Sequence, residues 1–485
     1  MASYNDLNLQ YISGEWREGK SDTVYENKNP YNDEVVNLIK LGTKEDIDEA
    51  YKSAEKAQVE WEQVSAFRKA EIFEKAVSIM QSRREEICNI IVEETGSSFV
   101  KANVELDFCI AITREAASFP MRMDGEIVPS LTPGKENRIY RRPVGVVGII
   151  SPFNFPMYLS MRSVAPALAA GNGVVLKPDG QTVMSGGLIL AKIFEEAGIP
   201  KGLFNVVAVS IQEIGDSFTD HPIPRVISFT GSTKVGLHIG EICARHMKKA
   251  ILELGGNNPM VVLEDADIER AVRSAAYGKY FHNGQICMAI NRIIVHESLY
   301  DDFVKRYVEI TKSIKVGDPR NPENMVGPLI NRGAVDRILG EIEKAKSEGA
   351  EVVLEGKVEG NVLSPFILTS KTNDVATAKN EMFGPVSTVI PFKTVQEAID
   401  IANDTPYGLS GAVHAASVEK GVEVAKRIRS GMVHINDQSV NDEPLIAFGG
   451  EKFSGLGRFG GKWSLDEFTT FQWIPVQNDP REYPF

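Results

Sequence analysis

With 485 residues, the chain is too long for one compact hydrophobic core and suits two or three domains. Its formal net charge of −13 excludes the overall basic field that draws a protein to nucleic acid or to an anionic membrane. Apolar runs such as 144–150 and 164–170 fall far short of a membrane span, so we expect neither a nucleic-acid nor a membrane partner.

The cysteine content predicts free thiols. The four cysteines have neither close pairing nor the spacing of metal ligands, so no metal site is expected. The first residues show no basic segment followed by an apolar one, and hence no indication of a secretory signal. These features favour a cytoplasmic protein, in which thiols stay reduced. The cysteines are Cys88, Cys109, Cys243 and Cys287.

The segment 144–254 alternates between strand-like and helical periodicity. It begins with a continuous apolar, β-branched run at 144–150, which is typical of a strand buried on both faces. A helical stretch over 157–169 follows and stops at Gly171-Asn172-Gly173. Further strands are expected at 174–177, 203–207, 225–229 and 250–254, and further helices at 183–197, 211–219 and 233–245. This order predicts a doubly wound parallel sheet with helices on both faces and ligands at the carboxyl ends of the strands.

A second α/β series opens after Gly255-Gly256. A strand at 260–263 precedes Asp267, a residue type that caps helices, and the helix after it should run to about Phe281. Alternating strands and helices continue to about Asn436. The fold class is therefore α/β, with two doubly wound domains. The predicted boundaries are 1–122 with 143–254 for the first domain and 255–445 for the second.

Two stretches fit neither domain and predict a small β element. Residues 123–142 have hairpin character, with turn signals at Pro129 and Pro133-Gly134, and 468–477 alternates apolar with polar residues. Neither stretch has enough apolar mass to be stable alone, and edge strands of this kind usually pair with a partner. We therefore expect 123–142 and 466–485 to build a subunit interface in a homodimer or homotetramer.

Two residues are candidates for nucleophilic and acid–base chemistry. Cys287 follows a helix that ends at Asn283-Gly284 and precedes a strand at 292–296, so it lies on a loop, where an accessible nucleophile is expected. By count alone it is one of four cysteines, and most buried cysteines are inert packing residues. Glu253 ends a strand just before Gly255-Gly256 and would project into a crevice between the domains as a general base, although a charge at a strand end is common.

Three further segments contain residue types that bind anions or polar groups. Asn154 lies in SPFNFP, between a buried strand and a helix, where its amide would stabilise an oxyanion or only satisfy its own turn. Lys177 follows an apolar strand and precedes Pro178, so it would reach a ribose or phosphate, or else remain in solvent. The turn Phe229–Gly236 joins a strand to a helix through small residues and offers free N–H groups to a phosphate.

The dinucleotide-binding pattern G-x-G-x-x-G occurs at 455–460. No predicted strand precedes it and no long helix follows it, so the structural context of a nucleotide-binding turn is missing. We predict that this run is a flexible glycine-rich loop near the domain junction.

Seven segments, taken together and in order, make the chain resemble the aldehyde dehydrogenase superfamily over nearly its whole length. They are SPFNFP (151–156), LKPD (176–179), FTGSTKVG (229–236), LELGGNNP (252–259), GQIC (284–287), EMFGP (381–385) and FGG with SGLGR (448–458). The resemblance implies NAD(P)-dependent oxidation of an aldehyde to its carboxylic acid. It also implies that the first domain binds the cofactor and that the second is catalytic.

The resemblance implies a role for each matching residue. Cys287 is the nucleophile, Asn154 and the Cys287 N–H stabilise the oxyanion, and Glu253 activates the water that hydrolyses the thioester. Lys177 and Glu381 hold the two riboses of NAD or NADP. The other residues expected to bind the cofactor are Ser151, Pro152, Phe153, Gly231, Ser232, Gly236, Leu254 and Phe383.

The segments LKPDGQT, ELGGNNP and GRFGG are similar to those of bacterial benzaldehyde and vanillin dehydrogenases. This similarity implies an aromatic aldehyde as the substrate. Arg162, one helical turn after Tyr158, would reach a polar substituent on the ring or form an ion pair. The residues expected to line the substrate pocket are Phe155, Tyr158, Arg162, Ile286 and Met288.

One departure from the family concerns the choice of cofactor. Many NAD-selective relatives have a glutamate three residues after the lysine that corresponds to Lys177, whereas this chain has Gly180. A carboxylate at that position would repel a 2′-phosphate at close range. Its absence predicts that NADP is used beside NAD.

Four alternatives to this interpretation remain. The substrate could be an aliphatic aldehyde or a semialdehyde. CoA could take the acyl group in place of water, although a water-activating Glu253 argues for hydrolysis. Cys287 could serve a hydrolase with a histidine such as His282, although no dyad motif is present. Finally, the fold could belong to a protein that binds ligands without catalysis.

Overall fold

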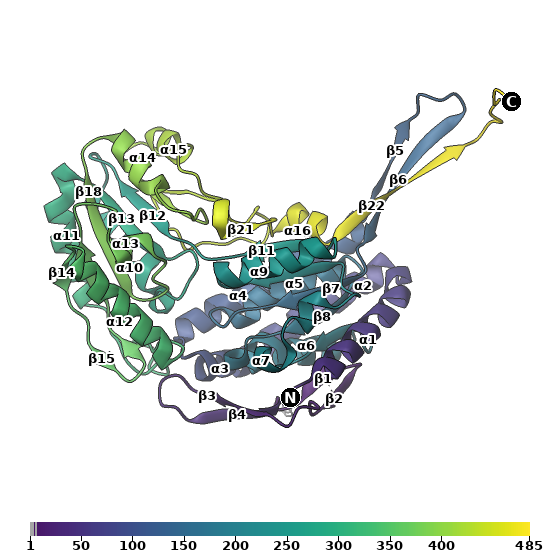
Figure 1. The fold of residues 1–485 in the computed structure, drawn as a ribbon, viewed down its shortest axis with the longest axis horizontal. Helices are drawn as coiled ribbons and strands as arrows, with labels where there is room; N and C mark the ends of the chain where they lie inside the picture. Colours follow the sequence, from purple (N-terminus) through teal and green to yellow (C-terminus); the bar gives the residue numbers. More distant parts are fainter. Residues whose placement is uncertain (1–3, 5–6) are drawn as a thin grey trace.

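Two α/β units and a projecting three-stranded sheet make up the molecule. The structure is a computed structural model and describes residue 4 and residues 7–485. The two units lie side by side, and the three-stranded sheet extends away from them (Figure 1). The predicted fold class, two doubly wound α/β domains with a small β element, is confirmed.

The first sheet has eight strands, with a parallel centre and antiparallel edges. In sheet order, they are β2 (Glu15–Arg17), β1 (Gln10–Ile12), β9 (Phe204–Val206), β8 (Gly173–Lys177), β7 (Val146–Ile150), β10 (Val226–Thr230), β11 (Lys249–Glu253) and β21 (Gly455–Leu456). Adjacent residues of β7 enter different hydrophobic clusters, because Val146 packs with Tyr51 and Val147 packs with Met161. Helices therefore cover both faces, as the apolar run predicts.

The helices of the first unit surround this sheet. They are α1 (Lys44–Gln63), α2 (Ala66–Ser82), α3 (Arg84–Thr95), α4 (Phe99–Ala117), α5 (Pro156–Ala169), α6 (Ile189–Ala197), α7 (Ile211–Ile214), α8 (Ser217–Asp220) and α9 (Thr233–Arg245). The prediction of one helix over 211–219 is wrong, because Gly215 adopts a φ of +55° and separates α7 from α8. The predicted helix 183–197 is regular only in α6, since a π-helical turn at Met184–Leu188 precedes it.

The second sheet has seven strands, of which only the edge strand β14 is antiparallel to its neighbour. In sheet order, they are β14 (Glu351–Leu354), β17 (Phe366–Thr369), β18 (Val386–Phe392), β13 (Ile290–His296), β12 (Asn258–Val262), β19 (Ala412–His414) and β20 (His434–Ile435). Its helices are α10 (Ile268–Tyr280), α11 (Glu297–Lys312), α12 (Arg332–Ser347), α13 (Ala376–Lys379), α14 (Val395–Asn403) and α15 (Val418–Ala425). The Asp267 side chain accepts a hydrogen bond from the Arg270 N–H and caps α10, as predicted.

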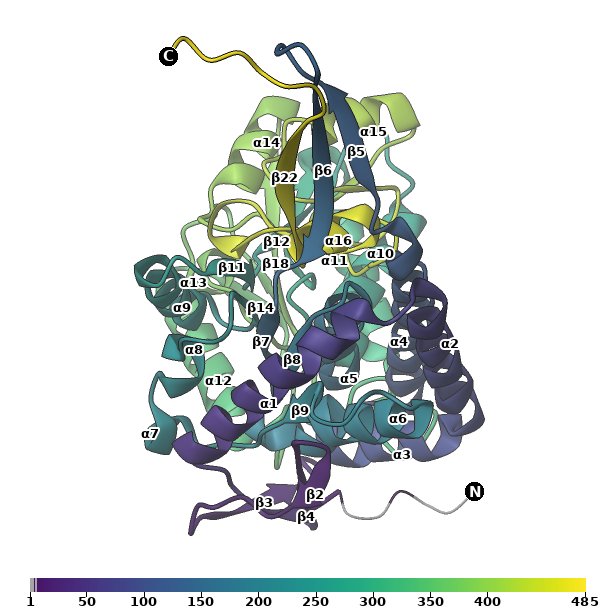
Figure 2. The same ribbon diagram turned by 90° about the vertical axis from the view of Figure 1, so that its right-hand side faces the viewer.

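The predicted hairpin and C-terminal strand form one antiparallel sheet of β22 (Thr469–Gln477), β6 (Lys135–Pro143) and β5 (Gly125–Pro129). The sheet projects from the body of the molecule together with the last residues of the chain (Figure 2). Several of its apolar side chains are exposed, among them Ile127 at 72%, Trp473 at 63% and Phe471 at 59%. Two further two-stranded sheets pair β3 (Val24–Lys28) with β4 (Val35–Lys40), and β15 (Val358–Glu359) with β16 (Val362–Leu363).

The glycine-rich run 455–460 corrects a prediction. Gly455-Leu456 forms β21 and pairs with Leu252 and Glu253 at the edge of the first sheet, so the run is not a free loop. A Cβ at Gly455 would lie 2.1 Å from the Leu252 carbonyl oxygen, and this close approach requires glycine. The run then leads into α16 (Gly461–Glu467). Across the described part of the chain, no helix is both long and apolar enough to cross a membrane.

Candidate active site

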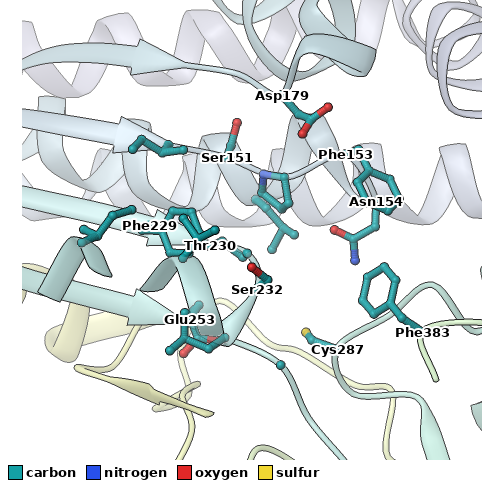
Figure 3. Close-up of a pocket in the computed structure, with 18 of the residues that line it drawn as sticks. Ser151, Phe153, Asn154, Asp179, Phe229, Thr230, Ser232, Glu253, Cys287 and Phe383 are labelled. Carbon is teal, nitrogen blue, oxygen red and sulfur yellow. The ribbon is translucent and has the colours of Figure 1, made fainter. Parts of the chain in front are cut away.

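A cleft of about 900 Å³ lies at the carboxyl ends of β7, β8, β10 and β11 and is closed by loops of the second unit (Figure 3). It contains the predicted nucleophile, base, oxyanion donor and ribose-binding residues. The predicted residues that line it are Ser151, Pro152, Phe153, Asn154, Lys177, Gly231, Ser232, Glu253, Leu254, Cys287, Glu381 and Phe383. The structure thus brings together predicted residues from six separate stretches of the sequence.

The loop that carries Cys287 is held in an unusual backbone conformation. His282, Asn283 and Gly284 all have positive φ values, of 47°, 57° and 69°. The Asn283 side chain fixes this turn, because it donates to the Pro328 carbonyl at 2.5 Å and accepts from the Gly327 N–H at 2.9 Å. Strained backbone of this kind persists only where its surroundings hold it, and here it places Cys287 at the cleft.

Asn154 is tied to the same loop. Its amide nitrogen donates a hydrogen bond of 2.9 Å to the carbonyl of Gln285, two residues before Cys287. In Figure 3 this nitrogen points toward the Cys287 loop. A primary amide nitrogen has two hydrogens, so one remains for an oxyanion formed at Cys287. The contact therefore ties Asn154 to the Cys287 loop, and its role as the oxyanion donor stays a prediction.

A buried carboxylate fixes the helix that follows Asn154. Glu105 of α4 accepts hydrogen bonds from the N–H groups of Met157 and Tyr158, at 2.8 Å and 3.1 Å, and so caps the start of α5. Its other oxygen pairs with Lys101 at 2.5 Å, and both side chains are fully buried. The Lys101 ammonium also lies 4.4 Å from the centre of the Phe155 ring. Sequence analysis did not find this pair, although its i, i+4 spacing on a helix is a signal for it.

Glu253 is the last residue of β11 and is buried, with 2% of its surface exposed. Among the described residues, neither carboxylate oxygen has a hydrogen bond of good geometry, although the Gly450 N–H lies close enough to favour the ionised form. Burial raises the pKa of Glu253 to about 7, and the nearby positive charge of Arg162 opposes that shift. A carboxylate with a pKa near neutrality is suited to act as a general base.

The Cys287 side chain is partly exposed, whereas Cys88, Cys109 and Cys243 are buried. All four, which lie within the described residues, are free thiols. Burial of the Cys287 sulfur raises the pKa of its thiol, and the charge of Glu253 raises it further. Attack by this sulfur therefore needs a base that takes its proton.

The polar groups opposite Cys287 fit a dinucleotide. The Lys177 side chain, at the end of β8, lines the cleft and has Asp179 as a charged neighbour. Asp179 lines the same part of the cleft and uses one carboxylate oxygen to accept from the Gln181 N–H at 2.9 Å. Glu381 accepts from the Gly256 N–H at 2.9 Å, and burial raises the pKa of its carboxyl to about 7. These groups have hydrogen-bonding capacity left for ribose hydroxyls.

The start of α9 supplies backbone donors. Its first residue follows Ser232, whose side chain does not cap the helix, so the N–H groups of the first turn remain open to an anion at the cleft. Gly236 does not line the cleft. A Cβ on Gly236 would lie 2.2 Å from a methyl carbon of Leu254, so this glycine lets the helix pack closely on the chain after β11. Its contact with the cofactor stays a prediction.

Comparison with known proteins identifies the family. The model of the aldehyde dehydrogenase family matches residues 16–474. The chain belongs to the aldehyde dehydrogenase family. Benzaldehyde dehydrogenase YfmT of Bacillus subtilis is 53% identical over 485 residues, which cover 100% of both chains. Vanillin dehydrogenase of Corynebacterium glutamicum is 48% identical and covers 97% of this chain, with 98% of its own length matched.

Solved structures agree with this family. The crystal structure of an NAD-dependent benzaldehyde dehydrogenase from Corynebacterium glutamicum matches with a TM-score of 0.91 and 44% identity, covering 100% of each chain. This aldehyde dehydrogenase is therefore an NAD(P)-dependent enzyme, as the sequence segments predict. The alternative of a ligand-binding protein without catalysis is not favoured.

The residues predicted for the substrate pocket lie outside the cleft lining. They are Phe155, Tyr158, Arg162, Ile286 and Met288, and all are buried. Four of them, without Arg162, share one apolar cluster against which Cys287 packs. The Phe155 ring faces His282, with 5.6 Å between ring centres, and burial lowers the pKa of that histidine well below its usual range. The contact of these five residues with a substrate stays a prediction.

Arg162 forms a buried ion pair, one of the two possibilities that its position left open. Its Nη1 lies 3.4 Å from Oδ2 of Asp442, and the Tyr158 hydroxyl donates to the same oxygen at 2.7 Å. Its Nη2 lies 3.8 Å from Oε2 of Glu253. Sequence analysis missed Asp442, because no motif marks it and it is distant from Arg162 along the chain.

Proposed function

We propose that this aldehyde dehydrogenase oxidises an aromatic aldehyde to its carboxylic acid through a thioester on Cys287. The observation that carries the proposal is the placement of Cys287, Asn154 and Glu253 at one cleft whose other end has Lys177 and Glu381. The similarity to benzaldehyde and vanillin dehydrogenases supports an aromatic substrate. A hydrophobic pocket discriminates only weakly between similar aromatic rings, so the relatives carry this part of the proposal.

In the first half of the reaction, the Cys287 sulfur attacks the aldehyde carbon and loses its proton to a base. The carbonyl oxygen becomes an oxyanion, which accepts hydrogen bonds from the Asn154 amide and the Cys287 N–H. Burial raises the pKa of the thiol, so this proton leaves as the sulfur attacks and passes to solvent water at the cleft. A bound nicotinamide cofactor supplies the hydride acceptor.

In the second half, Glu253 activates water to hydrolyse the thioester. A base acts in its ionised form, so hydrolysis should accelerate as the pH rises through the Glu253 pKa of about 7. The presence of this carboxylate at the same cleft as Cys287 supports hydrolysis over transfer of the acyl group to CoA. Because the reaction needs a free thiol, a reducing, cytoplasmic setting is part of the proposal.

The cofactor is NAD, and we propose that NADP is used as well. The NAD-dependent relative supports the first statement. For the second, a Cβ at Gly180 would meet only a ring carbon of Tyr25, at 3.8 Å, so the position next to the adenosine ribose is open. Asp179 lines the cleft, and its negative charge should weaken the binding of a 2′-phosphate without excluding NADP. An NADP kcat/KM below about a hundredth of the NAD value, a gap of roughly 2.7 kcal/mol, would refute dual use.

The same proposal assigns a function to each α/β unit and to the projecting sheet. Residues 1–122 with 143–254 bind the cofactor, and 255–445 carry the catalytic cysteine. The exposed apolar side chains of the projecting sheet, 123–142 with 466–485, support its use as an interface between copies of this chain. The assembly formed through this sheet is a homodimer or a homotetramer.

The function is tested by following reduction of NAD or NADP, in separate reactions, with a panel of aldehydes. The panel contains benzaldehyde, vanillin, short aliphatic aldehydes and succinic semialdehyde, and Cys287→Ala is the control. We expect the aromatic members to give the highest kcat/KM and the variant to be inactive. Preference for aliphatic or acidic aldehydes would refute the aromatic substrate, and formation of an acyl-CoA on adding CoA would refute hydrolysis.

A further inference from the structure

A buried arginine lies directly behind the proposed base. The Arg162 side chain is 2% exposed, and its guanidinium carbon lies 4.5 Å and 4.6 Å from the ring centres of Phe448 and Phe459. A planar guanidinium packs on aromatic rings in a defined orientation, which a lysine ammonium does not. The two rings therefore restrict the movement of Arg162.

The two terminal nitrogens of Arg162 face different carboxylates. Nη1 of Arg162 lies 3.4 Å from Oδ2 of Asp442, and the Tyr158 hydroxyl fixes that carboxylate by donating a hydrogen bond to it. Glu253 faces the other at 3.8 Å, beyond hydrogen-bonding distance. Asp442 and Tyr158 thus hold one end of the guanidinium, and the other end is directed at the base.

The Glu253 side chain is held less tightly than those of Arg162 and Asp442. Its carboxylate is buried, and Arg162, at 3.8 Å, is the main group that compensates its charge, with smaller contributions from Arg458 and the Gly450 N–H. In Figure 3 Glu253 lies on the β11 side of the cleft, apart from the Cys287 sulfur. The attraction of Arg162 favours the ionised form of Glu253. Because Arg162 does not hydrogen-bond to the carboxylate, the Glu253 side chain can still turn toward a thioester on Cys287.

We propose that Arg162, held by Asp442 and Tyr158, is a positioning residue that keeps Glu253 ionised and oriented for hydrolysis of the Cys287 thioester. This inference rests on the proposed function. In the step that it serves, a water oxygen bonds to the thioester carbon and one proton of that water passes to Glu253. The bond from carbon to Sγ then breaks, which releases the carboxylic acid and the Cys287 thiolate.

The charges around Glu253 determine the sign of the effect. Burial raises its pKa to about 7, Arg162 lowers that pKa, Asp442 raises it, and Arg458 and the Gly450 N–H lower it. The charge of Glu253 in turn raises the pKa of the Cys287 thiol. Removing the charge of Arg162 should therefore raise the pKa of the base, and removing that of Asp442 should lower it. Structural damage alone would not produce shifts of opposite sign.

The test measures the rate constant of thioester hydrolysis as a function of pH. Wild type, Arg162→Met, Arg162→Lys and Asp442→Asn turn over benzaldehyde with NAD, and intact-mass spectrometry of quenched samples gives the fraction of acylated Cys287. Dividing kcat by that fraction gives the rate constant. Arg306→Met is the matched control, because Arg306 pairs with Asp302 on the surface helix α11.

We expect the pH midpoint of hydrolysis to rise by about one unit in Arg162→Met, which makes hydrolysis about tenfold slower below the midpoint. Arg162→Lys should shift it less, Asp442→Asn should lower it, and the control should match wild type. An unchanged midpoint in Arg162→Met, or shifts of the same sign in the Arg162 and Asp442 variants, would overturn the inference.

Two further results distinguish a misfolded variant, and a failure of the proposed function, from a failure of the inference about Arg162. If Arg162→Met does not fold, Asp442→Asn decides, since a lowered midpoint supports the inference and an unchanged one overturns it. If wild type neither oxidises benzaldehyde nor forms an acyl-enzyme, the proposed function itself fails. A wild type that oxidises benzaldehyde while its variants keep the wild-type midpoint refutes only the role of Arg162.

Discussion

The buried pair of Lys101 and Glu105 makes a strong prediction about stability. Both side chains are fully buried and lie 2.5 Å apart, and Glu105 also accepts from two N–H groups at the start of α5. Replacing Glu105 by alanine leaves a buried ammonium without its partner and two backbone donors without an acceptor. We expect a loss of roughly 3–5 kcal/mol in the free energy of unfolding, because removing one partner leaves an uncompensated buried charge.

A double variant separates the charge from the cap. In Lys101→Met with Glu105→Gln, no charge is buried, while the glutamine oxygen still accepts from the start of α5. We expect this double variant to be within about 1 kcal/mol of wild type, since replacing both charges is often close to neutral. It should also be more stable than Lys101→Met alone.

The assay is urea unfolding followed by circular dichroism at neutral pH, together with kcat/KM for benzaldehyde. The alanine variant should also lose activity, because Asn154 lies two residues before α5 and depends on its position. A cost below about 1 kcal/mol for Glu105→Ala would refute the reasoning. So would a double variant that is as unstable as the single one.

Three further predictions follow from the site and the projecting sheet. Asn154→Ala should lower kcat for benzaldehyde by about 10²–10³-fold, and a smaller loss than tenfold would exclude it as the main oxyanion donor. Gly180→Glu should reduce kcat/KM with NADP at least about tenfold more than with NAD, because a carboxylate repels the 2′-phosphate; equal losses would contradict this. Trp473→Asp should dissociate the oligomer in analytical ultracentrifugation, whereas Val59→Asp, with the same exposure of 63% on α1, should not.

The sequence contains enough information for the parallel sheets and for the set of residues that meet at the cleft. Strand and helix periodicity in 144–254 depends on local residues, and the helix over 233–245 matches α9. The strand Gly455-Leu456 could not be predicted in the same way. Its partner in β11 is about 200 residues earlier, and a two-residue strand has no periodicity of its own.

The surroundings of Arg162 show the same limit for the site. Position on α5 predicts that it is close to Tyr158, and the structure agrees in that both reach Asp442. Whether an arginine faces a substrate or an ion pair depends on a carboxylate from another part of the chain. The direction of Phe155, toward Lys101 and His282, depends likewise on tertiary packing and not on the motif that contains it.

The central claim is that the acyl group is carried by Cys287 and released by Glu253. The most direct measurement mixes Glu253→Gln with NAD and benzaldehyde, quenches in acid, and locates added mass by intact and peptide mass spectrometry. The account predicts one equivalent of reduced cofactor and a benzoyl group on the peptide with Cys287, which persists because hydrolysis is slow. Steady oxidation by this variant without an adduct on Cys287 would contradict it.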